Sequence, residues 1–195
     1  MKISAQDLDF RQGWDANDTK VGPLLSRDAP ASPATQFSDT DRYQILTKSE
    51  SDACRGVGSL VSAARGWLGT PYHDQASLRG VGCDCLGLAR GVWREVVGAE
   101  SFPIPSYSRD WGETGRCEVL AEGVRRMMSE IAPTDAVPGA LILFRMTPRA
   151  IAKHVGILTS ADSFIHAYER LGVIEEVLTP TWRRRIAFAF LFPQS

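Results

Sequence analysis

Two thiols stand in the stretch Gly82-Cys83-Asp84-Cys85-Leu86-Gly87-Leu88, at the start of a predicted helix. From Cys85 onward, apolar residues recur at helical spacing until Gly98, which is placed to end the helix. Asp84 fits the N-cap, so Cys85 falls in the first turn. There the unpaired backbone N–H groups and a nearby cation can lower the pKa of a thiol from ~8.5 to roughly 3.5–7.5. Cys85 rather than Cys83 is the predicted nucleophile, with a cysteine that only packs in the core as the alternative.

Two predicted strands further along the chain each carry a histidine. His154 lies near the start of Lys153–Leu158, and His166 lies within Ser163–Ala167. Neighbouring antiparallel strands can place two such side chains together on one face. One imidazole would then serve the thiol as a base, while the other holds the tautomer of the first. The pattern therefore predicts a nucleophile, a base and an orienting group.

Four motifs in sequence order carry a resemblance to a known family: Gly69-Thr70-Pro71-Tyr72, Asp84-Cys85-Leu86-Gly87-Leu88, His154-Val155-Gly156-Ile157 and Ile165-His166-Ala167. Over about residues 57–193 the chain resembles the NlpC/P60 family of papain-like cysteine peptidases. Within that family it is most similar to the tail-associated cell-wall peptidases of tailed phages and gene transfer agents. The resemblance implies hydrolysis of peptidoglycan stem peptides, typically at the bond between γ-D-glutamate and the diamino acid, without a metal or organic cofactor.

The resemblance also assigns roles to individual residues. It implies that Cys85 is the nucleophile, His154 the base and His166 the third polar residue. It implies that Tyr72 is a substrate-side aromatic residue, whose hydroxyl could stabilise an oxyanion together with a backbone N–H. The family commonly has serine after the nucleophile, where it helps to bind the free amine of a stem peptide. Leu86 has no hydrogen-bonding side chain, so Asp84 alone remains for that contact, and intact wall is the expected substrate.

The expected mechanism starts from a His154 imidazolium paired with the Cys85 thiolate and passes through a thioester that water hydrolyses. The alternative from a different class is a structural tail component that binds but does not turn over. The joint presence of Cys85, His154 and His166 argues against it, because the loss of any one would suffice to abolish catalysis. A third possibility is an acyl or amide transferase on the same fold. It differs from a peptidase only in whether water or an amine accepts the acyl group.

Composition divides the 195 residues into two parts. Residues 1–55 are polar and interrupted by prolines, which indicates either a floppy tail or an arm that orders on phage-like tail or baseplate proteins. Residues 56–195 form the predicted catalytic domain, an α+β fold with helices first and a mainly antiparallel sheet after. The helices are expected around residues 60–68, 85–97 and 119–131, with Cys117 in the first turn of the last, and the strands around 140–144, 153–158, 163–167, 173–178 and 186–192.

Charge and targeting signals narrow the partners. A net charge of -1 gives no basis for nucleic-acid binding. No stretch approaches transmembrane length and the start shows no signal-peptide pattern, so we expect no membrane insertion. The expected route is synthesis in the bacterial cytoplasm, incorporation into a virion-like tail and action on the wall in the periplasm.

Three features stay open. His73 with Cys83 and Cys85 allows a metal alternative, but a zinc site needs four ligands at recognisable spacing, so no metal site is predicted. Residues 99–115 could line a groove or cover the core. The run Arg183-Arg184-Arg185 is expected to be a solvated strand start, or else a contact for an acidic stem peptide or a partner.

Overall fold

The computed structural model describes residues 56–101 and 117–193. All of them belong to one unit of the chain, Asp39–Ser195. The arm predicted for residues 1–55 and most of the 99–115 segment lie outside the described residues. Within the two described ranges, no helix is both long enough and apolar enough to cross a bilayer.

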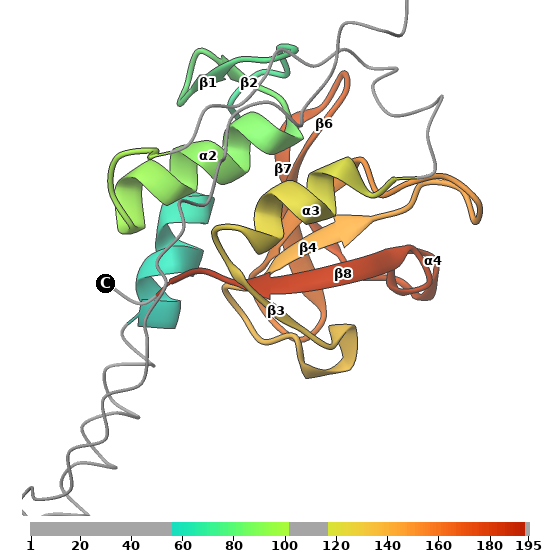
Figure 1. Cartoon of the computed structure of the whole chain (residues 1–195). Helices are drawn as coiled ribbons and strands as arrows, with labels where there is room; N and C mark the ends of the chain where they lie inside the picture. Colours follow the sequence, from blue (N-terminus) through green and yellow to red (C-terminus); the bar gives the residue numbers. More distant parts are fainter. Residues whose placement is uncertain (1–55, 102–116, 194–195) are drawn as a thin grey trace, which may run out of the picture. The chain divides into compact units, whose positions relative to one another are not determined.

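A six-stranded sheet occupies the second half of the chain (Figure 1). Its strand order is β3-β8-β4-β5-β6-β7, and every neighbouring pair is antiparallel. The expected α+β fold with a mainly antiparallel sheet is therefore confirmed. The strands are β3 (Ser129–Ile131), β4 (Leu141–Phe144), β5 (His154–Leu158), β6 (Ser163–Tyr168), β7 (Gly172–Val177) and β8 (Ile186–Leu191).

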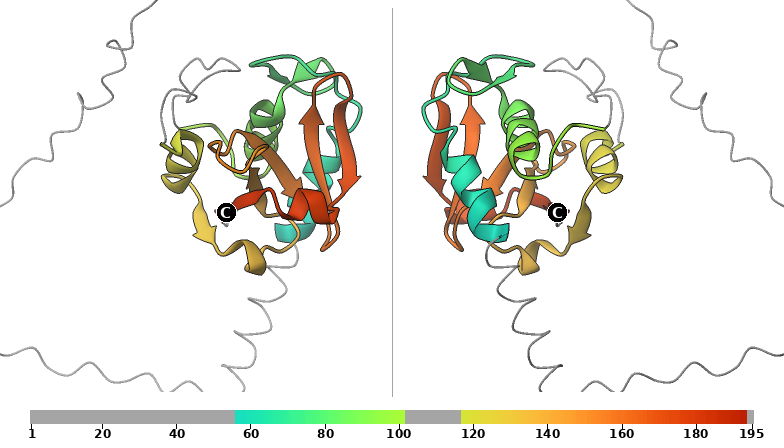
Figure 2. Two further views of the ribbon diagram at one scale, coloured as in Figure 1. Left: turned by 90° about the vertical axis from the view of Figure 1, so that its right-hand side faces the viewer. Right: turned by 90° about the vertical axis from the view of Figure 1, so that its left-hand side faces the viewer.

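The helical elements come mainly from the first half of the described chain. Residues 56–65 are helical, and α2 (Cys85–Val96) follows a small hairpin of β1 (Ser77–Leu78) and β2 (Gly82–Cys83). In Figures 1 and 2 this hairpin lies beside one end of the β6–β7 pair, which β2 contacts. The remaining helical segments are α3 (Val119–Arg125), η1 (Pro133–Asp135) and α4 (Pro180–Arg183).

The sheet separates two apolar clusters because successive side chains of a strand point to opposite faces. On one face, Val155, Ile157, Ile165 and Ala167 join Leu88 and other residues of α2 in the larger cluster. On the other face, Ile142, Phe144, Leu158 and Phe164 pack with Trp182 of α4. As a result α2, which begins at Cys85, lies against β5 and β6, the strands that carry the two histidines.

Three predictions about local structure are wrong. The helix expected over 119–131 ends at Arg125, and Ser129–Ile131 instead pairs with Leu191–Ala189 as the edge strand β3, because that pairing supplies β8 with hydrogen-bond partners. Cys117 does not lie in the first turn of this helix, because α3 begins only at Val119, and the Cys117 side chain is exposed.

The arginine run does not start a strand. Thr179 caps α4 with Pro180 at its first position, so Arg183 ends this short helix and β8 begins only at Ile186. The backbone N–H groups of Arg184 and Arg185 bond back to Pro180 and Trp182, which accounts for the turn.

Candidate active site

The first turn of α2 is fixed by Asp84, which caps the helix as predicted. Its Oδ1 accepts a hydrogen bond from the Gly87 backbone N–H at 2.7 Å, and its Oδ2 accepts one from the Gln75 N–H at 2.8 Å. The Asp84 side chain is buried, so it joins the start of the helix to the preceding loop. It does not line the pocket described below, and its contact with substrate stays a prediction.

Glycine at position 87 has a steric cause. A Cβ atom there would lie 1.9 Å from the backbone oxygen of Ala76, so no other residue fits while this loop stays in place. The Ser77 hydroxyl also donates to the Gly87 carbonyl at 2.5 Å. The loop before the helix therefore packs directly on the turn that carries Cys85.

Cys83 lies in β2 and has no access to the site. Its backbone N–H donates to the Pro71 oxygen at 3.0 Å, and its oxygen accepts from the His73 N–H at 3.1 Å, so Cys83 holds the segment that contains Tyr72. Burial, and to a lesser extent the Asp84 charge, raises the pKa of the Cys83 thiol to about 12. This position agrees with the prediction that Cys83 is not the nucleophile.

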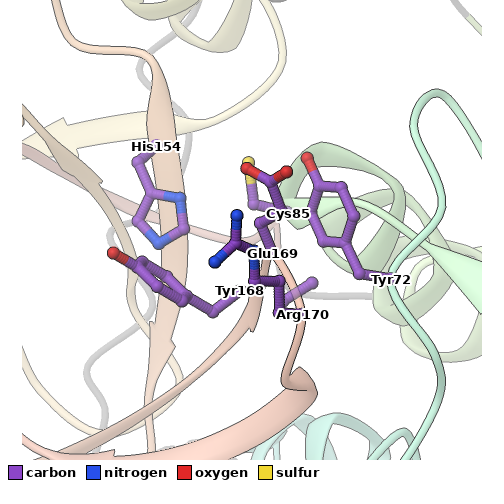
Figure 3. A pocket seen from close by; sticks show the side chains of 7 residues that line it. Tyr72, Cys85, His154, Tyr168, Glu169 and Arg170 are labelled. Carbon is purple, nitrogen blue, oxygen red and sulfur yellow. The ribbon is translucent and has the colours of Figure 1, made fainter.

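A pocket of about 390 Å³ opens at the start of α2 (Figure 3). It brings together Cys85, His154 and Tyr72, three of the residues singled out from the sequence. Residues 168–170 at the β6–β7 turn complete its wall, and sequence reasoning missed them. The Tyr72 hydroxyl donates to Asp74 Oδ1 at 3.1 Å, which fixes the ring at the rim. The complete lining is Tyr72, Cys85, His154, Ala167, Tyr168, Glu169 and Arg170.

The two histidines contact each other across β5 and β6. His154 Nε2 lies 2.8 Å from His166 Nδ1, and His166 Nε2 lies 3.1 Å from Glu176 Oε2. His166 is fully buried and lies outside the pocket lining, behind the lining residue His154 that it contacts. Because Nε2 of His154 is engaged by His166, Nδ1 is the ring nitrogen available to a reacting group. The prediction that the histidines lie together on one face is confirmed.

Hydrogen bonds to Glu118, at the start of α3, hold the loop that precedes His154. Glu118, the N-cap residue of α3, accepts from the Ala152 N–H at 2.9 Å and from Arg145 at 2.7 Å. The Cys85 Sγ in turn lies 3.9 Å from the Lys153 carbonyl oxygen, toward which the thiol can donate. These contacts set the start of β5 against the first turn of α2.

The pKa shifts at the site run against the predicted ion pair, which stays a prediction. Burial raises the pKa of the half-buried Cys85 thiol to about 12, and the Asp84 carboxylate adds to this effect. The backbone N–H groups of Val155, Leu86 and Cys85 favour the thiolate, as expected at a helix N-terminus, but burial outweighs them. Burial also lowers the pKa of His154 to about 3, and the nearby His166 contributes. The raised thiol pKa and the lowered imidazole pKa both favour a neutral thiol and a neutral imidazole.

The described residues around His73 form no cluster of metal ligands. Among the residues with described positions, no three His, Cys, Asp or Glu side chains are placed to hold an ion. The exposed His73 ring instead packs over Gly82, where an added Cβ would come within 2.3 Å of it.

Glu176 and Trp182 are the other residues that sequence reasoning missed. Glu176 sits at an alternating position of a predicted strand, and only the strand register shows that it reaches His166. Trp182 lies in a helix that was not predicted, and its Nε1 donates to Glu176 Oε1 at 3.0 Å.

Comparison with known proteins agrees with this geometry. The sequence profile of the NlpC/P60 family matches residues 69–189. The chain is similar to the Murein DD-endopeptidase MepS/Murein LD-carboxypeptidase of Escherichia coli strain K12, with 28% identity over 120 residues, or 61% of this chain and 54% of that protein. It is 25% identical over 128 residues to the Probable endopeptidase NlpC of the same strain, covering 66% of this chain and 72% of that protein. The chain thus spans about half the length of the first relative.

Two solved structures share the fold. An NLP/P60 family protein from Staphylococcus aureus subsp. aureus Mu50, described as similar to lipoprotein, aligns with a TM-score of 0.50 and 20% identity, over 85% of this chain and 46% of that one. An NLPC/P60 family protein from Bacillus cereus ATCC 10987 aligns with a TM-score of 0.51 and 21% identity, over 70% and 40% of the two chains. At these identities the likeness establishes the fold alone.

Proposed function

This chain belongs to the NlpC/P60 family, and on that basis we propose that it is a cysteine peptidase that hydrolyses peptidoglycan stem peptides. The observation that carries the proposal is the pocket shared by Cys85 and His154, with His154 Nε2 held 2.8 Å from His166. A nucleophile on a helix start, a base on a facing strand and an orienting group behind the base are what acyl transfer from an amide requires. The murein endopeptidase named above supports the choice of peptidoglycan.

The reaction would begin with the neutral pair. His154 Nδ1 accepts the thiol proton as Cys85 Sγ attacks the amide carbonyl, and the negative charge moves to the carbonyl oxygen. Tyr72 lines the same pocket, and its hydroxyl is the candidate donor to that oxygen once its proton turns away from Asp74. His154 then protonates the leaving amine, which leaves a thioester on Cys85. A water molecule gives its proton to His154, attacks the thioester and releases the carboxylic acid together with the restored thiol.

A cation in the pocket supports the γ-D-glutamyl bond as the target. Arg170 lines the site at the β6–β7 turn with φ +69°, a backbone conformation that non-glycine residues rarely adopt. Its guanidinium forms no hydrogen bond or ion pair with any residue that the structure describes. A γ-linked glutamate keeps its α-carboxylate free next to the scissile bond. Arg170 would bind that carboxylate, because a guanidinium matches a carboxylate in two parallel hydrogen bonds.

Delivery to the wall is the second part of the proposal. The sequences of the four motifs resemble those of tail-associated peptidases of phages and gene transfer agents, so we infer that the protein is carried to the wall in a phage-like tail or baseplate. Residues 1–55 would dock it there, because a polar arm with a few aromatic residues can order on a partner. Deletion of residues 1–50 should leave the peptidase activity of the purified protein near normal and remove it from assembled particles. Normal incorporation of the truncated chain would move the docking surface to the catalytic domain.

Incubation with purified stem peptides followed by mass spectrometry tests the catalytic proposal. We expect a single cleavage after γ-D-glutamate by the full chain, and none by the Cys85→Ala variant. Cys83→Ala is the matched control, because that thiol lies in β2 away from the pocket. If the full chain binds stem peptides but cleaves none of them, the protein is the silent tail component described as the alternative.

A further inference from the structure

Glu176 lies on β7, the strand that neighbours the His166 strand β6. We propose that it is a positioning residue that fixes the tautomer of His154 through His166. The inference rests on the proposed use of His154 as a base, but it concerns hydrogen positions that can be observed without any substrate. Three residues on three adjacent strands would thus act as one relay: His154 on β5, His166 on β6 and Glu176 on β7.

Strand register explains why Glu176 reaches His166. On β7, Glu176 is the partner of Phe164, while His166 is the partner of Ile174. Glu176 and His166 are therefore diagonal neighbours on one face, within reach of long side chains. The preceding residue, Glu175, points to the opposite face, where it bonds Arg65 at 2.9 Å and Thr159 at 2.6 Å. The sequence Glu175-Glu176 thus places one carboxylate inside the relay and an identical one outside it.

The direction of each hydrogen bond follows from the carboxylate. A carboxylate only accepts, and Glu176 accepts from Trp182 Nε1–H at 3.0 Å through Oε1. Its Oε2 lies 3.1 Å from His166 Nε2, so that nitrogen carries the proton and His166 Nδ1 has the lone pair. His166 Nδ1 in turn accepts from His154 Nε2–H at 2.8 Å. His154 Nδ1 is then left with a lone pair, which is the form a general base needs.

The surroundings leave the relay no other way to satisfy these groups. His166 is fully buried, and its ring packs against Phe164, Trp182 and Tyr168 with centroid distances of 4.6, 5.3 and 5.5 Å. A reversed tautomer would set an imidazole lone pair against the carboxylate and leave both without a proton between them. Glu176 itself keeps 39% of its side chain exposed, so its charge stays partly solvated. Its charge can therefore favour the imidazolium that forms on His154, at a small cost of burial.

The decisive variant is Glu176→Gln, which keeps the shape but adds a donor. Its amide oxygen can still accept from Trp182, and its NH₂ group would then donate to His166 Nε2. That reversal moves a proton to His166 Nδ1 and another to His154 Nδ1, where it blocks the base. We expect kcat on stem peptides to fall by about 100-fold or more with KM little changed. Glu175→Gln is the matched control and should keep the wild-type kcat.

Nitrogen-15 NMR of the imidazole rings in the full chain reads the tautomer directly. In the wild type we expect His154 and His166 both protonated on Nε2, and in Glu176→Gln both protonated on Nδ1. A wild-type His154 that carries its proton on Nδ1 would overturn the proposal without any variant, even if Glu176→Gln did not fold. Equal losses of kcat in Glu175→Gln and Glu176→Gln would also overturn it. If the wild type cleaves no stem peptide, the proposed function fails while the NMR result still decides the relay.

Discussion

Lowering the pH from 8 to 5 should destabilise the folded chain through His154. Burial holds the pKa of this ring at about 3 instead of its ordinary 6.5, so at pH 5 it stays neutral when folded and protonates when unfolded. The unfolded state then binds more protons, and stability falls as the pH drops below 6.5. Because pH 5 lies about 1.5 units below that value and each unit is about 1.4 kcal/mol, the loss from this ring is about 2 kcal/mol.

Urea unfolding of the full chain and of His154→Gln at the two pH values isolates this contribution. Glutamine does not titrate and can still hydrogen-bond to His166. Arg90 and Arg94 hold the pKa of Glu100 below its usual range, and such ion pairs weaken at low pH in the wild type and in the variant alike. Their contribution therefore cancels when the stability losses of the two proteins are compared. We expect the wild type to lose about 2 kcal/mol more than the variant. An equal loss, or a wild type that gains stability at pH 5, would show that folded His154 is protonated and would refute the neutral pair.

Three further predictions concern reactivity. Iodoacetamide should modify exposed Cys117 before Cys85 at pH 7, because burial raises the pKa of the Cys85 thiol to about 12 and keeps it protonated there. Peptide mapping that finds rapid labelling of Cys85 at pH 6 would show that the thiolate already forms at that pH. His154→Ala should lower kcat by on the order of 10²–10⁴-fold, and His166→Asn should lower it less, because of the two histidines only His154 contacts the reacting atoms. Equal losses of kcat in the two folded variants would show that His166 takes part in the chemistry directly. Arg170→Gln should raise KM about tenfold for stem peptides with a free α-carboxylate but not for the amidated form, and Arg79→Gln is the control. An equal rise of KM for both substrates would show that Arg170 does not bind the α-carboxylate.

The parts of the fold that were predictable depend on local patterns. Asp84 and the apolar residues at helical spacing after it predict the helix that begins at Cys85. In the structure Asp84 is the N-cap of this helix. The alternating strands β5 to β8 are similarly local signals, and β5, β6 and β7 lie side by side in chain order. The position of β8 between β3 and β4 is not a local signal, because this strand crosses from β7 to the other side of β4. Local patterns predict helix for Ser129–Ile131 because Ile131 continues the apolar spacing of the preceding helix, and pairing with β8 overrides that local preference.

The missing parts of the site depend on contacts between distant residues. Arg170 enters the pocket only because a turn between β6 and β7 takes a left-handed backbone at this position. Glu176 looks like any solvent-facing carboxylate of a strand, and its neighbour Glu175 has the same side chain. The raised pKa of Cys85 likewise comes from burial under elements that lie far along the chain, whereas the helix start that favours a thiolate is visible in the sequence.

The neutral resting pair makes the relay more important for catalysis. The raised pKa of Cys85 and the lowered pKa of His154 make the transfer of the thiol proton to the ring unfavourable in the resting site. Any group that stabilises the thiolate–imidazolium pair only after the proton has moved then raises the rate directly, since the resting state gains nothing from it. The Val155 and Leu86 N–H groups stand on the thiolate side of that pair, and Glu176, through His166, stands on the imidazolium side.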